Sequence, residues 1–399
     1  MTGQERVFLL KKYITHLLFQ YMEKDITKIL NEIDTINPYA TYLNESTLSS
    51  STGWISTGSM PLNAVISGSL YGGIPRNRLT MICGESMSGK SFIVIKTLAN
   101  AQKQGLIPVI FDTENAIDKS MAANLGLDTS MVKYVPCFSI EQTRNSIYKF
   151  LTKAKEQGVE DKFIVAIDSL GNLENELSIN RMEKESTSMD MGTRARAIKS
   201  LLRTCTQLSA YTKTTFICTN HTYDDPSAMY ESIIKNQPGG KSVVYLPSVT
   251  VQLARKPEKS DEGKTMDGEL TVGQRNYPGV ILRALTVKNR YIQQYLQTEM
   301  YLSFKSGLDK YYGLLDLAVG FGVVVQTGST YAFPDGEKIG YFKNWRKNEA
   351  VWERILPSLE KSIKEKWAYG KVVDEDVPEE LCDNSKDITK PVEVNEEDI

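Results

Sequence analysis

Apolar residues recur along the chain in short blocks that polar and glycine-bearing segments separate. Over residues 5–33 they recur every three or four positions, which predicts an amphipathic helix or helix pair. The next stretch, Asn44 to Thr52, is polar and rich in serine and threonine, a composition typical of a connector. From Trp54 onward, short apolar runs alternate with helical stretches, which indicates a folded core of strands and helices.

Four apolar runs in this core predict strands, at 79–83, 109–111, 163–167 and 215–219. Helical pattern separates each run from the next, so right-handed crossovers and a mostly parallel sheet are expected. Residues 311–370 look helical, with aromatic side chains spaced along them, and predict a small C-terminal lobe. The fold class is therefore α/β, with an N-terminal helical segment over 1–50, a core over 51–310, a lobe over 311–370 and a tail over 371–399.

Composition narrows the class of protein. The chain has 399 residues, 41% hydrophobic and 24% charged, as expected for a soluble globular protein. Its five cysteines are scattered and it has only two histidines, which argues against a disulfide scaffold, a zinc site or a multi-histidine metal centre. No apolar run is long enough to span a bilayer and the N-terminus does not resemble a secretory signal, so a cytoplasmic protein without a membrane partner is expected.

The net charge of −2 hides an uneven distribution along the chain. Residues 374–399 carry eleven acidic and two basic side chains, which leaves a body with a net charge of +7. A basic body with an acidic tail is typical of proteins that contact nucleic acid, where the tail competes with phosphates for the basic surface. A solvated tail that only aids solubility explains the same composition.

One segment fits the phosphate-binding pattern GxxxxGK[ST] at every fixed position. It follows an apolar strand and opens a helix, the context in which this pattern forms a P-loop. Its backbone N–H groups would surround the phosphates of ATP, the lysine would neutralise their charge, and the final hydroxyl would bind Mg²⁺. The predicted ATP-binding residues are Gly84, Glu85, Ser86, Met87, Ser88, Gly89, Lys90 and Ser91.

Two acidic residues complete a predicted nucleoside triphosphatase site. Asp168 ends a buried strand, as a carboxylate that holds a water on Mg²⁺ would, so Ser91 and Asp168 are the expected metal residues. Glu114 follows the second strand and would polarise the attacking water, which makes Glu114 and Lys90 the expected catalytic residues. A turn-forming role for Asp168 and a helix N-terminal role for Glu114 are the simpler alternatives.

These motifs, together with several others, resemble the RecA-type recombinases. The stretch before the first strand, Trp54 to Ser59, resembles the ISTGS lead-in of that family, and the P-loop GESMSGKS is similar to its GPESSGKT. Segments 114–118, 287–290 and 336–340 also look like family segments. The stretches Asp168 to Leu173 and Asn220 to Tyr223 look closest to the UvsX-type recombinases of tailed phages. The resemblance covers roughly residues 54–345.

The resemblance implies a RecA-like P-loop ATPase that forms a helical filament on single-stranded DNA and exchanges that strand into a homologous duplex. Asp118 would hydrogen-bond the adenine amino group, and Met121 stands where the family often stacks a tyrosine on the base; a thioether covers a purine less specifically. Lys288 and Arg290 would reach the γ-phosphate held by a neighbouring protomer, although a solvated strand end is the alternative. The N-terminal helix would dock on that neighbour, or act as a local lid.

A cationic helix face is the strongest DNA-binding candidate. Residues 192–213 hold five basic side chains and no acidic one, and Arg196, Lys199 and Arg203 share one face of a helix whose opposite face is apolar. Such a face grips a phosphate backbone without reading sequence. Basic faces are often only solvated, but Arg196 and Arg203 match phosphate contacts of the family.

Two loops are further candidates. The polar stretch 175–191 has no helical periodicity and resembles the first DNA-binding loop of the family, although it carries acidic residues as well as basic ones. Residues 223–242 form the second candidate, with Gly239, Gly240 and Lys241 at the start of a helix, where backbone N–H groups can hold a phosphate. An ordinary surface loop is the alternative. Tyr223 and Tyr230 could lie against bases.

Asn220 and His221 end the fourth strand, between the nucleotide and the second loop. The family places a glutamine at the position of His221, where it reports the γ-phosphate to the DNA loop, so these two residues are expected to couple nucleotide to DNA. A structural histidine is the alternative.

Together the motifs predict an ATP- and Mg²⁺-dependent, DNA-stimulated recombinase that acts on single- and double-stranded DNA in recombination, repair and recombination-dependent replication. Its expected partners are further copies of the chain, single-strand-binding proteins and recombination mediators. The rivals are a hexameric helicase with a RecA fold, which usually has a large separate N-terminal domain, and a DNA-binding mediator that uses ATP only as a switch.

Overall fold

The computed structural model divides the chain into two compact units, residues 1–58 with 74–254, and residues 59–73 with 255–399. The first part of the expected N-terminal helix and the acidic tail lie outside the described residues, and the domain boundaries expected from the sequence stay a prediction. The structure describes residues 26–33, 35–37, 39–46, 48, 50–115, 117–183, 192–224, 233–256 and 279–369.

The first unit is built on a parallel sheet whose six strands lie in the order β8-β3-β7-β6-β4-β5. The four strands expected from the sequence are β3, β4, β6 and β7, so the α/β fold with a mostly parallel sheet is confirmed. The strands are β3 (Leu79–Gly84), β4 (Ile107–Asp112), β5 (Lys133–Pro136), β6 (Phe163–Asp168), β7 (Thr215–His221) and β8 (Val249–Lys256).

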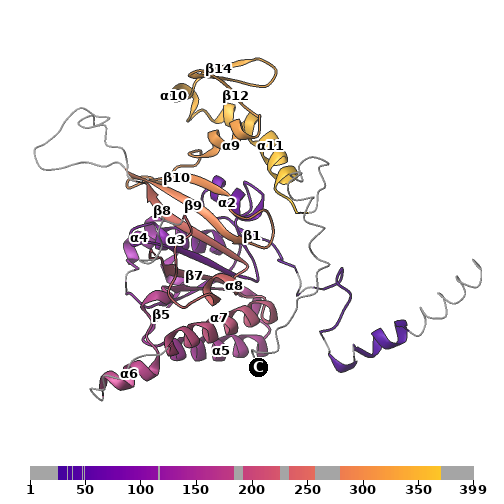
Figure 1. The fold of residues 1–399 in the computed structure, drawn as a ribbon, viewed down its shortest axis with the longest axis vertical. Helices are drawn as coiled ribbons and strands as arrows, with labels where there is room; N and C mark the ends of the chain where they lie inside the picture. The colour runs from indigo at the N-terminus through magenta and orange to yellow at the C-terminus, as the bar shows by residue number, and fades with distance from the viewer. Residues whose placement is uncertain are drawn as a thin grey trace, which may run out of the picture. The chain divides into compact units, whose positions relative to one another are not determined.

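Helices cover both faces of this sheet. α3 (Lys90–Gln102) packs on one face, and α5 (Ile140–Glu156) and α7 (Thr193–Tyr211) lie side by side on the other (Figure 1). A short antiparallel pair, β1 with β2, precedes β3. The remaining elements of the unit are β1 (Trp54–Ile55), β2 (Ile74–Pro75), α4 (Lys119–Asn124), α6 (Glu176–Glu183), α8 (Ser242–Tyr245) and the 3₁₀ turns Thr129–Met131, Glu160–Lys162 and Leu170–Asn172.

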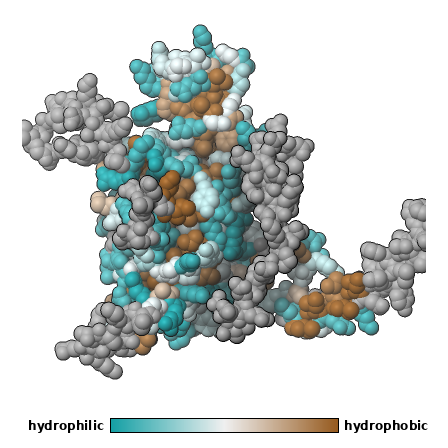
Figure 2. All heavy atoms as spheres, in the orientation of Figure 1, coloured by the Kyte–Doolittle hydropathy of each residue, from teal (hydrophilic) through white to brown (hydrophobic). Residues whose placement is uncertain are grey.

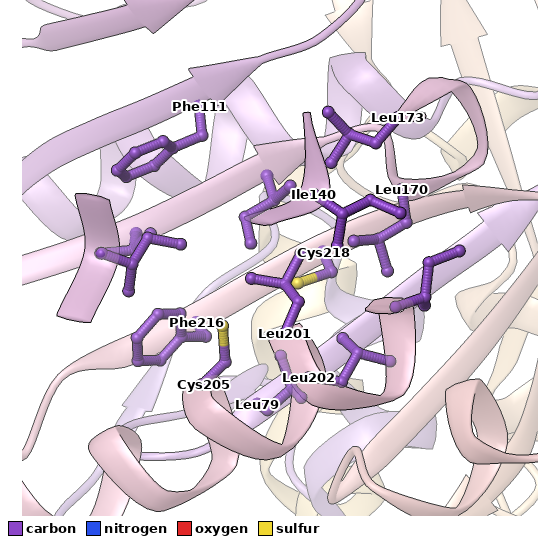
Figure 3. Packing of buried hydrophobic residues seen from close by; sticks show 14 of the residues in the cluster. Leu79, Phe111, Ile140, Leu170, Leu173, Leu201, Leu202, Cys205, Phe216 and Cys218 are labelled. Carbon is purple, nitrogen blue, oxygen red and sulfur yellow. The ribbon is translucent and has the colours of Figure 1, made fainter. Parts of the chain in front are cut away.

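The main hydrophobic core lies between the sheet and the α5–α7 layer. Figure 3 shows Leu79 and Phe216 of the sheet facing Leu201 of α7, and all three are at most 1% exposed. The apolar stripe predicted for α7 supplies this packing, which leaves its basic residues on the opposite side. α5 begins where the Ser139 hydroxyl accepts a hydrogen bond from the N–H of Gln142, at 3.0 Å.

The second unit combines an antiparallel sheet, β9-β10-β11, with α2, which packs on β9 and β10. A separate aromatic cluster forms its C-terminal part, where the Tyr311 ring stacks on the buried Trp352 at 5.0 Å. The elements are α2 (Met60–Ser67), β9 (Gly279–Asn289), β10 (Gln297–Ser303), β11 (Gly307–Leu308), α9 (Leu314–Gly320), β12 (Val325–Thr327), β13 (Thr330–Ala332), β14 (Lys338–Tyr341), α10 (Phe342–Trp345) and α11 (Glu349–Lys366).

Two sequence-based expectations about secondary structure are wrong. Residues 311–370 are not helical throughout, because β12, β13 and β14 form a three-stranded antiparallel sheet in which Gly328 and Gly336 adopt positive φ at the turns. The stretch 175–191, expected to lack helical structure, contains α6, whose start is capped by a hydrogen bond from the Ser178 N–H to the Asn175 side chain at 2.7 Å.

Residues 26–33 are helical, as the N-terminal pattern predicts, and the helix keeps its apolar side chains exposed. Ile29 is 62% exposed and Ile33 45%. Figure 2 shows apolar atoms gathered over this helix. Across the described part of the chain, no helix has the length and apolarity that crossing a bilayer requires.

Two buried threonines of the central sheet lack hydrogen-bond partners among the described residues. Thr80 on β3 and Thr250 on β8 are both fully buried, and neither hydroxyl makes a hydrogen bond. Replacing either with valine keeps the side-chain shape and removes a polar group that burial penalises. We expect Thr80→Val and Thr250→Val each to raise the free energy of unfolding by about 1 kcal/mol. Denaturant titration measures the change, and an unchanged or lower midpoint would contradict it.

Candidate functional site

The predicted chemical residues meet at one edge of the parallel sheet. β3, β7, β6 and β4 are consecutive neighbours, and their carboxyl ends lead into the P-loop, His221, Asp168 and Glu114, respectively. Parallel strands place their carboxyl ends at the same edge, which is where ligands bind in sheets of this kind. The structure therefore brings together residues that lie more than a hundred positions apart in the chain.

The P-loop turns tightly between β3 and α3. Gly84 has no room for a side chain, because a Cβ there would lie 2.4 Å from the Leu253 carbonyl oxygen and 2.5 Å from the Ser88 hydroxyl. Gly89 adopts a left-handed conformation with φ of 84°, and Met87 does so with φ of 63°. The side chains of Glu85, Ser86 and Met87 are exposed, whereas that of Ser88 is buried. The glycines predicted for a phosphate-binding turn are thus required by its geometry.

Lys90 and Ser88 fit a phosphate ligand. The Lys90 ammonium donates to the carbonyl oxygens of Gly84 and Glu85, at 3.0 and 2.8 Å, so it lies within the loop. Burial lowers the pKa of Lys90, although the nearby carboxylates of Asp168 and Glu114 oppose that shift. The buried Ser88 hydroxyl has no hydrogen-bond partner among the described residues. A charged donor and an unsatisfied hydroxyl in one loop are groups that phosphate oxygens would satisfy.

Asp168 and Ser91 fit a magnesium ion. Asp168 is 5% exposed, and its carboxylate accepts hydrogen bonds from the hydroxyls of Thr219 and Ser91. Burial raises the pKa of Asp168, and the negative charges of Glu114 and Asp112 add to the rise, while these two hydrogen bonds oppose it. Bound Mg²⁺ would favour the charged carboxylate, and oxygen ligands are the ones Mg²⁺ prefers. Among the described residues, no cluster of three or more metal-binding side chains occurs.

Glu114 lies in a hydrogen-bonded group of three side chains. Its Oε1 atom accepts a hydrogen bond from the Ser169 hydroxyl at 2.6 Å and lies 3.0 Å from Nε2 of His221. Ser169 itself lies 3.3 Å from the same histidine nitrogen. Burial acts to raise the pKa of Glu114, but the hydrogen bonds from Ser169 and His221 outweigh it, so the pKa is lowered. The expected water-activating carboxylate is therefore held in its charged form.

Two residues that organise Glu114 were not identified from the sequence. One is Ser169, and the other is Asp112 at the end of β4, whose Oδ1 atom accepts hydrogen bonds from the N–H groups of Glu114 and Asn115, both at 2.9 Å. The Tyr134 hydroxyl donates to the other oxygen of Asp112, at 3.2 Å. The sequence could have indicated the role of Asp112, because it stands two residues before Glu114 and aspartate carboxylates often accept hydrogen bonds from the backbone N–H groups that follow them.

Asp118 and Met121, the expected adenine contacts, lie at the start of α4. The Asp118 carboxylate caps this helix by accepting a hydrogen bond from the N–H of Met121, at 2.7 Å. One carboxylate oxygen therefore has a structural role, and the contact of Asp118 with adenine stays a prediction. The same holds for the packing of Met121, which is partly exposed, on a base.

Asn220 and His221 face in different directions from the end of β7. The His221 ring approaches Glu114 and Ser169, and it also lies against Gly171, where a Cβ would meet the ring at 2.7 Å. The buried Asn220 amide instead donates to the carbonyl oxygen of Pro238, at 3.0 Å. The pair thus connects Glu114 and Ser169 with Pro238, which lies near the C-terminal end of the second candidate loop.

The basic face of α7 has the predicted geometry. Arg196, Lys199 and Arg203 are exposed, while Ile198 and Leu201 are buried. Gly239 and Gly240 have φ of 100° and 69°, and Lys241 directly precedes the short helix α8. A Cβ at Gly239 would lie 2.8 Å from Ile198, so this glycine lets the returning end of the second loop approach α7. Residues 184–191 and 225–232 of the two loops, including Tyr230, lie outside the described residues, and Tyr223 is 51% exposed.

Lys288 and Arg290 lie at the end of β9 in the second unit, which is described separately from the P-loop. Burial lowers the pKa of Lys288 to about 8, and the positive charge of Arg290 contributes. Lys288 is partly buried and lies close to the positive charge of Arg290. A bound anion would stabilise the charged form of Lys288. Their contact with a phosphate of a neighbouring protomer stays a prediction.

The Ser169–Glu114 hydrogen bond should be visible in the pH dependence of nucleotide hydrolysis. A carboxylate base works above its pKa and is lost as the pH falls through that value. Ser169→Ala removes a donor that lowers the pKa of Glu114, so we expect the acidic limb of kcat for ATP hydrolysis to move to higher pH. The control is Ser209→Ala, a buried serine whose hydroxyl donates to the Thr206 carbonyl oxygen of its own helix. Identical acidic limbs in wild type and Ser169→Ala would contradict the assignment.

Comparisons with known proteins agree with this geometry. The sequence profile of the RecA N-terminal domain matches residues 25–309. The protein RecA of Nocardioides sp. is 31% identical over 330 residues, which cover 80% of this chain and 87% of that protein. RecA of Chlorobium chlorochromatii is 32% identical over 286 residues, 72% of this chain and 74% of that protein. With a P-loop, two partner carboxylates and this similarity along most of its length, the chain belongs to the RecA family.

Proposed function

We propose that this protein is a DNA-dependent ATPase that forms a filament on single-stranded DNA and catalyses homologous pairing and strand exchange. The observation that carries the proposal is the hydrogen-bonded group at the sheet edge. In it Glu114 contacts Ser169, which follows Asp168, and His221, which ends the strand that leads into the second loop. One hydrogen-bonded group thus joins residues suited to hydrolysis with a segment suited to binding DNA.

In the hydrolytic step, each residue of the group has a distinct task. The P-loop N–H groups and Lys90 would hold the phosphates, and Ser91 and Asp168 would hold Mg²⁺, which would supply positive charge to the phosphate oxygens. Glu114, kept ionised by its hydrogen bonds, accepts a proton from the attacking water. Asp118 and Met121 contact the adenine.

DNA binding is assigned to the exposed face of α7 and to the second loop. Arg196, Lys199 and Arg203 contact the phosphate backbone, which gives binding without sequence preference. Gly239, Gly240 and Lys241 add backbone N–H groups and a further positive charge beside the same helix. This arrangement suits both single-stranded and double-stranded DNA.

Assembly into a helical homo-oligomer is assigned to two features. The exposed apolar side chains of the helix at 26–33 need a partner surface, and a second copy of the chain offers one. Lys288 and Arg290 supply cations that approach the γ-phosphate of a neighbour, which makes assembly depend on ATP.

The finer identity of the protein follows the resemblance of the segments at 168–173 and 220–223. These segments favour a recombinase of the UvsX type from a tailed phage, acting in the host cytoplasm in recombination, repair and recombination-dependent replication. Single-strand-binding and mediator proteins are the expected partners. The segments at 1–50, 51–310, 311–370 and 371–399 are proposed to serve assembly, catalysis with DNA binding, a C-terminal lobe and an acidic tail.

The decisive experiment is ATP-dependent formation of joint molecules. Labelled single strands are mixed with supercoiled duplex that is either homologous or unrelated, and we expect pairing with the homologous duplex alone. Lys90→Ala should abolish pairing, because it removes the cation of the phosphate site. The matched control is Lys96→Ala on the same helix, whose ammonium binds the Leu125 carbonyl oxygen at 3.1 Å, and this variant should still pair strands.

Other outcomes would point to other members of the ATPase class. ATP hydrolysis stimulated by single strands without pairing, together with duplex unwinding, would replace the proposal with a hexameric helicase. DNA binding that responds to ATP without turnover would indicate a mediator that uses ATP as a switch.

His221 is expected to transmit the nucleotide state to DNA. His221 contacts Glu114 and ends β7, the strand that leads into the second loop. We expect His221→Ala to bind ATP with wild-type affinity but to lose most of the tightening on single-stranded DNA that ATP causes, about tenfold or more. Fluorescence anisotropy of a labelled oligonucleotide, with and without ATP, measures that ratio. An equal ratio in mutant and wild type would rule out this role.

A further inference from the structure

Two amide side chains flank the strand that leads into the P-loop. β3 pairs with β7 on one side and with β8 on the other, and Cys83 is in register with Asn220 on β7 and with Gln252 on β8. Residues in register on neighbouring parallel strands point to the same face of the sheet. Asn220 and Gln252 therefore lie on either side of Cys83, the residue that precedes the first P-loop residue, Gly84.

The Gln252 side chain forms two hydrogen bonds with the C-terminal part of the second loop, at residues 233 and 235. Its Oε1 atom accepts a hydrogen bond from the N–H of Lys235 at 2.9 Å, and its Nε2 atom donates to the carbonyl oxygen of Ile233 at 2.8 Å. Gln252 itself is 7% exposed, whereas Lys235 is half-buried and Ile233 is exposed, so the two bonds join a buried side chain to a segment at the surface. The amide thus satisfies one donor and one acceptor of a backbone segment that belongs to no strand or helix.

Asn220 holds the same segment from the opposite side. Its amide donates to the Pro238 carbonyl oxygen at 3.0 Å and to the Gln237 side chain at 3.3 Å. The backbone groups of Tyr223 and Asn236 exchange two hydrogen bonds, both 3.0 Å long. The stem at 233–238 is thereby fastened to both strands that border the P-loop strand.

An amide at position 252 supplies both the acceptor and the donor that this double attachment uses. A carboxylate in place of the amide could accept from Lys235 but would face the Ile233 carbonyl oxygen with no proton to donate. An aliphatic side chain would remove both hydrogen bonds and leave the Lys235 N–H and the Ile233 carbonyl oxygen without the partner that Gln252 supplies. The two strands that hold the stem are the ones that pair with β3, the strand that leads into the P-loop.

We propose that Gln252 is a positioning residue that fastens the stem of the DNA-binding loop to the strand beside the P-loop and so transmits the nucleotide state to DNA affinity. The inference rests on the proposed function, because it takes residues 223–242 as a DNA-binding loop. It adds a connection through β8 to the one assigned to His221 through β7. The side-chain hydrogen bonds of Gln252 are with Ile233 and Lys235 of the stem.

The test compares Gln252→Leu, which removes both hydrogen bonds, with Gln252→Glu, which keeps only the acceptor. The matched control is Thr250→Val, on the same strand and the same face, two residues away and fully buried. Affinity for a labelled oligothymidylate is measured by anisotropy with ATPγS, with ADP and without nucleotide. The KM for ATP and the oligothymidylate concentration that half-maximally stimulates hydrolysis are measured on the same proteins.

Both Gln252 variants should lose about tenfold of the ATPγS-dependent gain in DNA affinity and need correspondingly more DNA for stimulation, at an unchanged KM for ATP. Thr250→Val should match wild type in every readout. A direct check is tryptic cleavage after Lys235, which should be faster in both variants than in the control.

The possible results separate the two proposals. A wild-type protein whose DNA affinity ignores ATPγS would overturn the proposed function itself. A wild type that responds, with Gln252 variants that respond equally, would overturn the role of Gln252 and leave the function standing. Loss of ATP affinity and DNA affinity together in both variants would show general damage to the fold and would also reject the positioning role.

Discussion

The parallel pairing of β3 with β7 on one side and β8 on the other is the constraint on which the site depends. This pairing fixes the P-loop beside His221 and sets Gln252 and Asn220 at equal height around Cys83. β6 and β4 continue the same edge and add Asp168 and the turn with Glu114. Backbone hydrogen bonding thus determines the distances at which side chains of distant segments meet, before any ligand binds.

Electrostatics then refine what the sheet has assembled. The carboxylates of Glu114 and Asp168 lie close to the ammonium of Lys90, and burial opposes the charged form of all three groups. The structure separates their states by hydrogen bonding: Ser169 and His221 favour the ionised form of Glu114, whereas burial prevails at Asp168. A cation held by Asp168 would favour the ionised form of both carboxylates and so oppose the burial that raises the pKa of Asp168.

Much of this site was predictable from the sequence because its strongest signals are local. The P-loop is a contiguous pattern, Asp168 ends a buried strand, and the stripe of α7 follows from periodicity. The roles of Ser169, Asp112 and Gln252 were not predicted. They depend on which strands are neighbours and on the register between them, and the local spacing of residues in the sequence indicates neither. The sheet at 325–341 was missed for a different reason, since aromatic residues spaced along 311–370 suggested helix while two turn glycines decided the structure.

The path of the chain between the two units bears on how the protein folds. Residues 59–73 belong to the second unit although the first unit both precedes and follows them. α2 lies in this segment and packs on β9 and β10, which come after every strand of the parallel sheet. During synthesis α2 therefore emerges long before the surface that covers it, with Leu62 and Val65 still exposed to water. A nascent chain of this protein must carry an uncovered apolar helix until its last third is made, which defines a period in which a chaperone would have a site to bind.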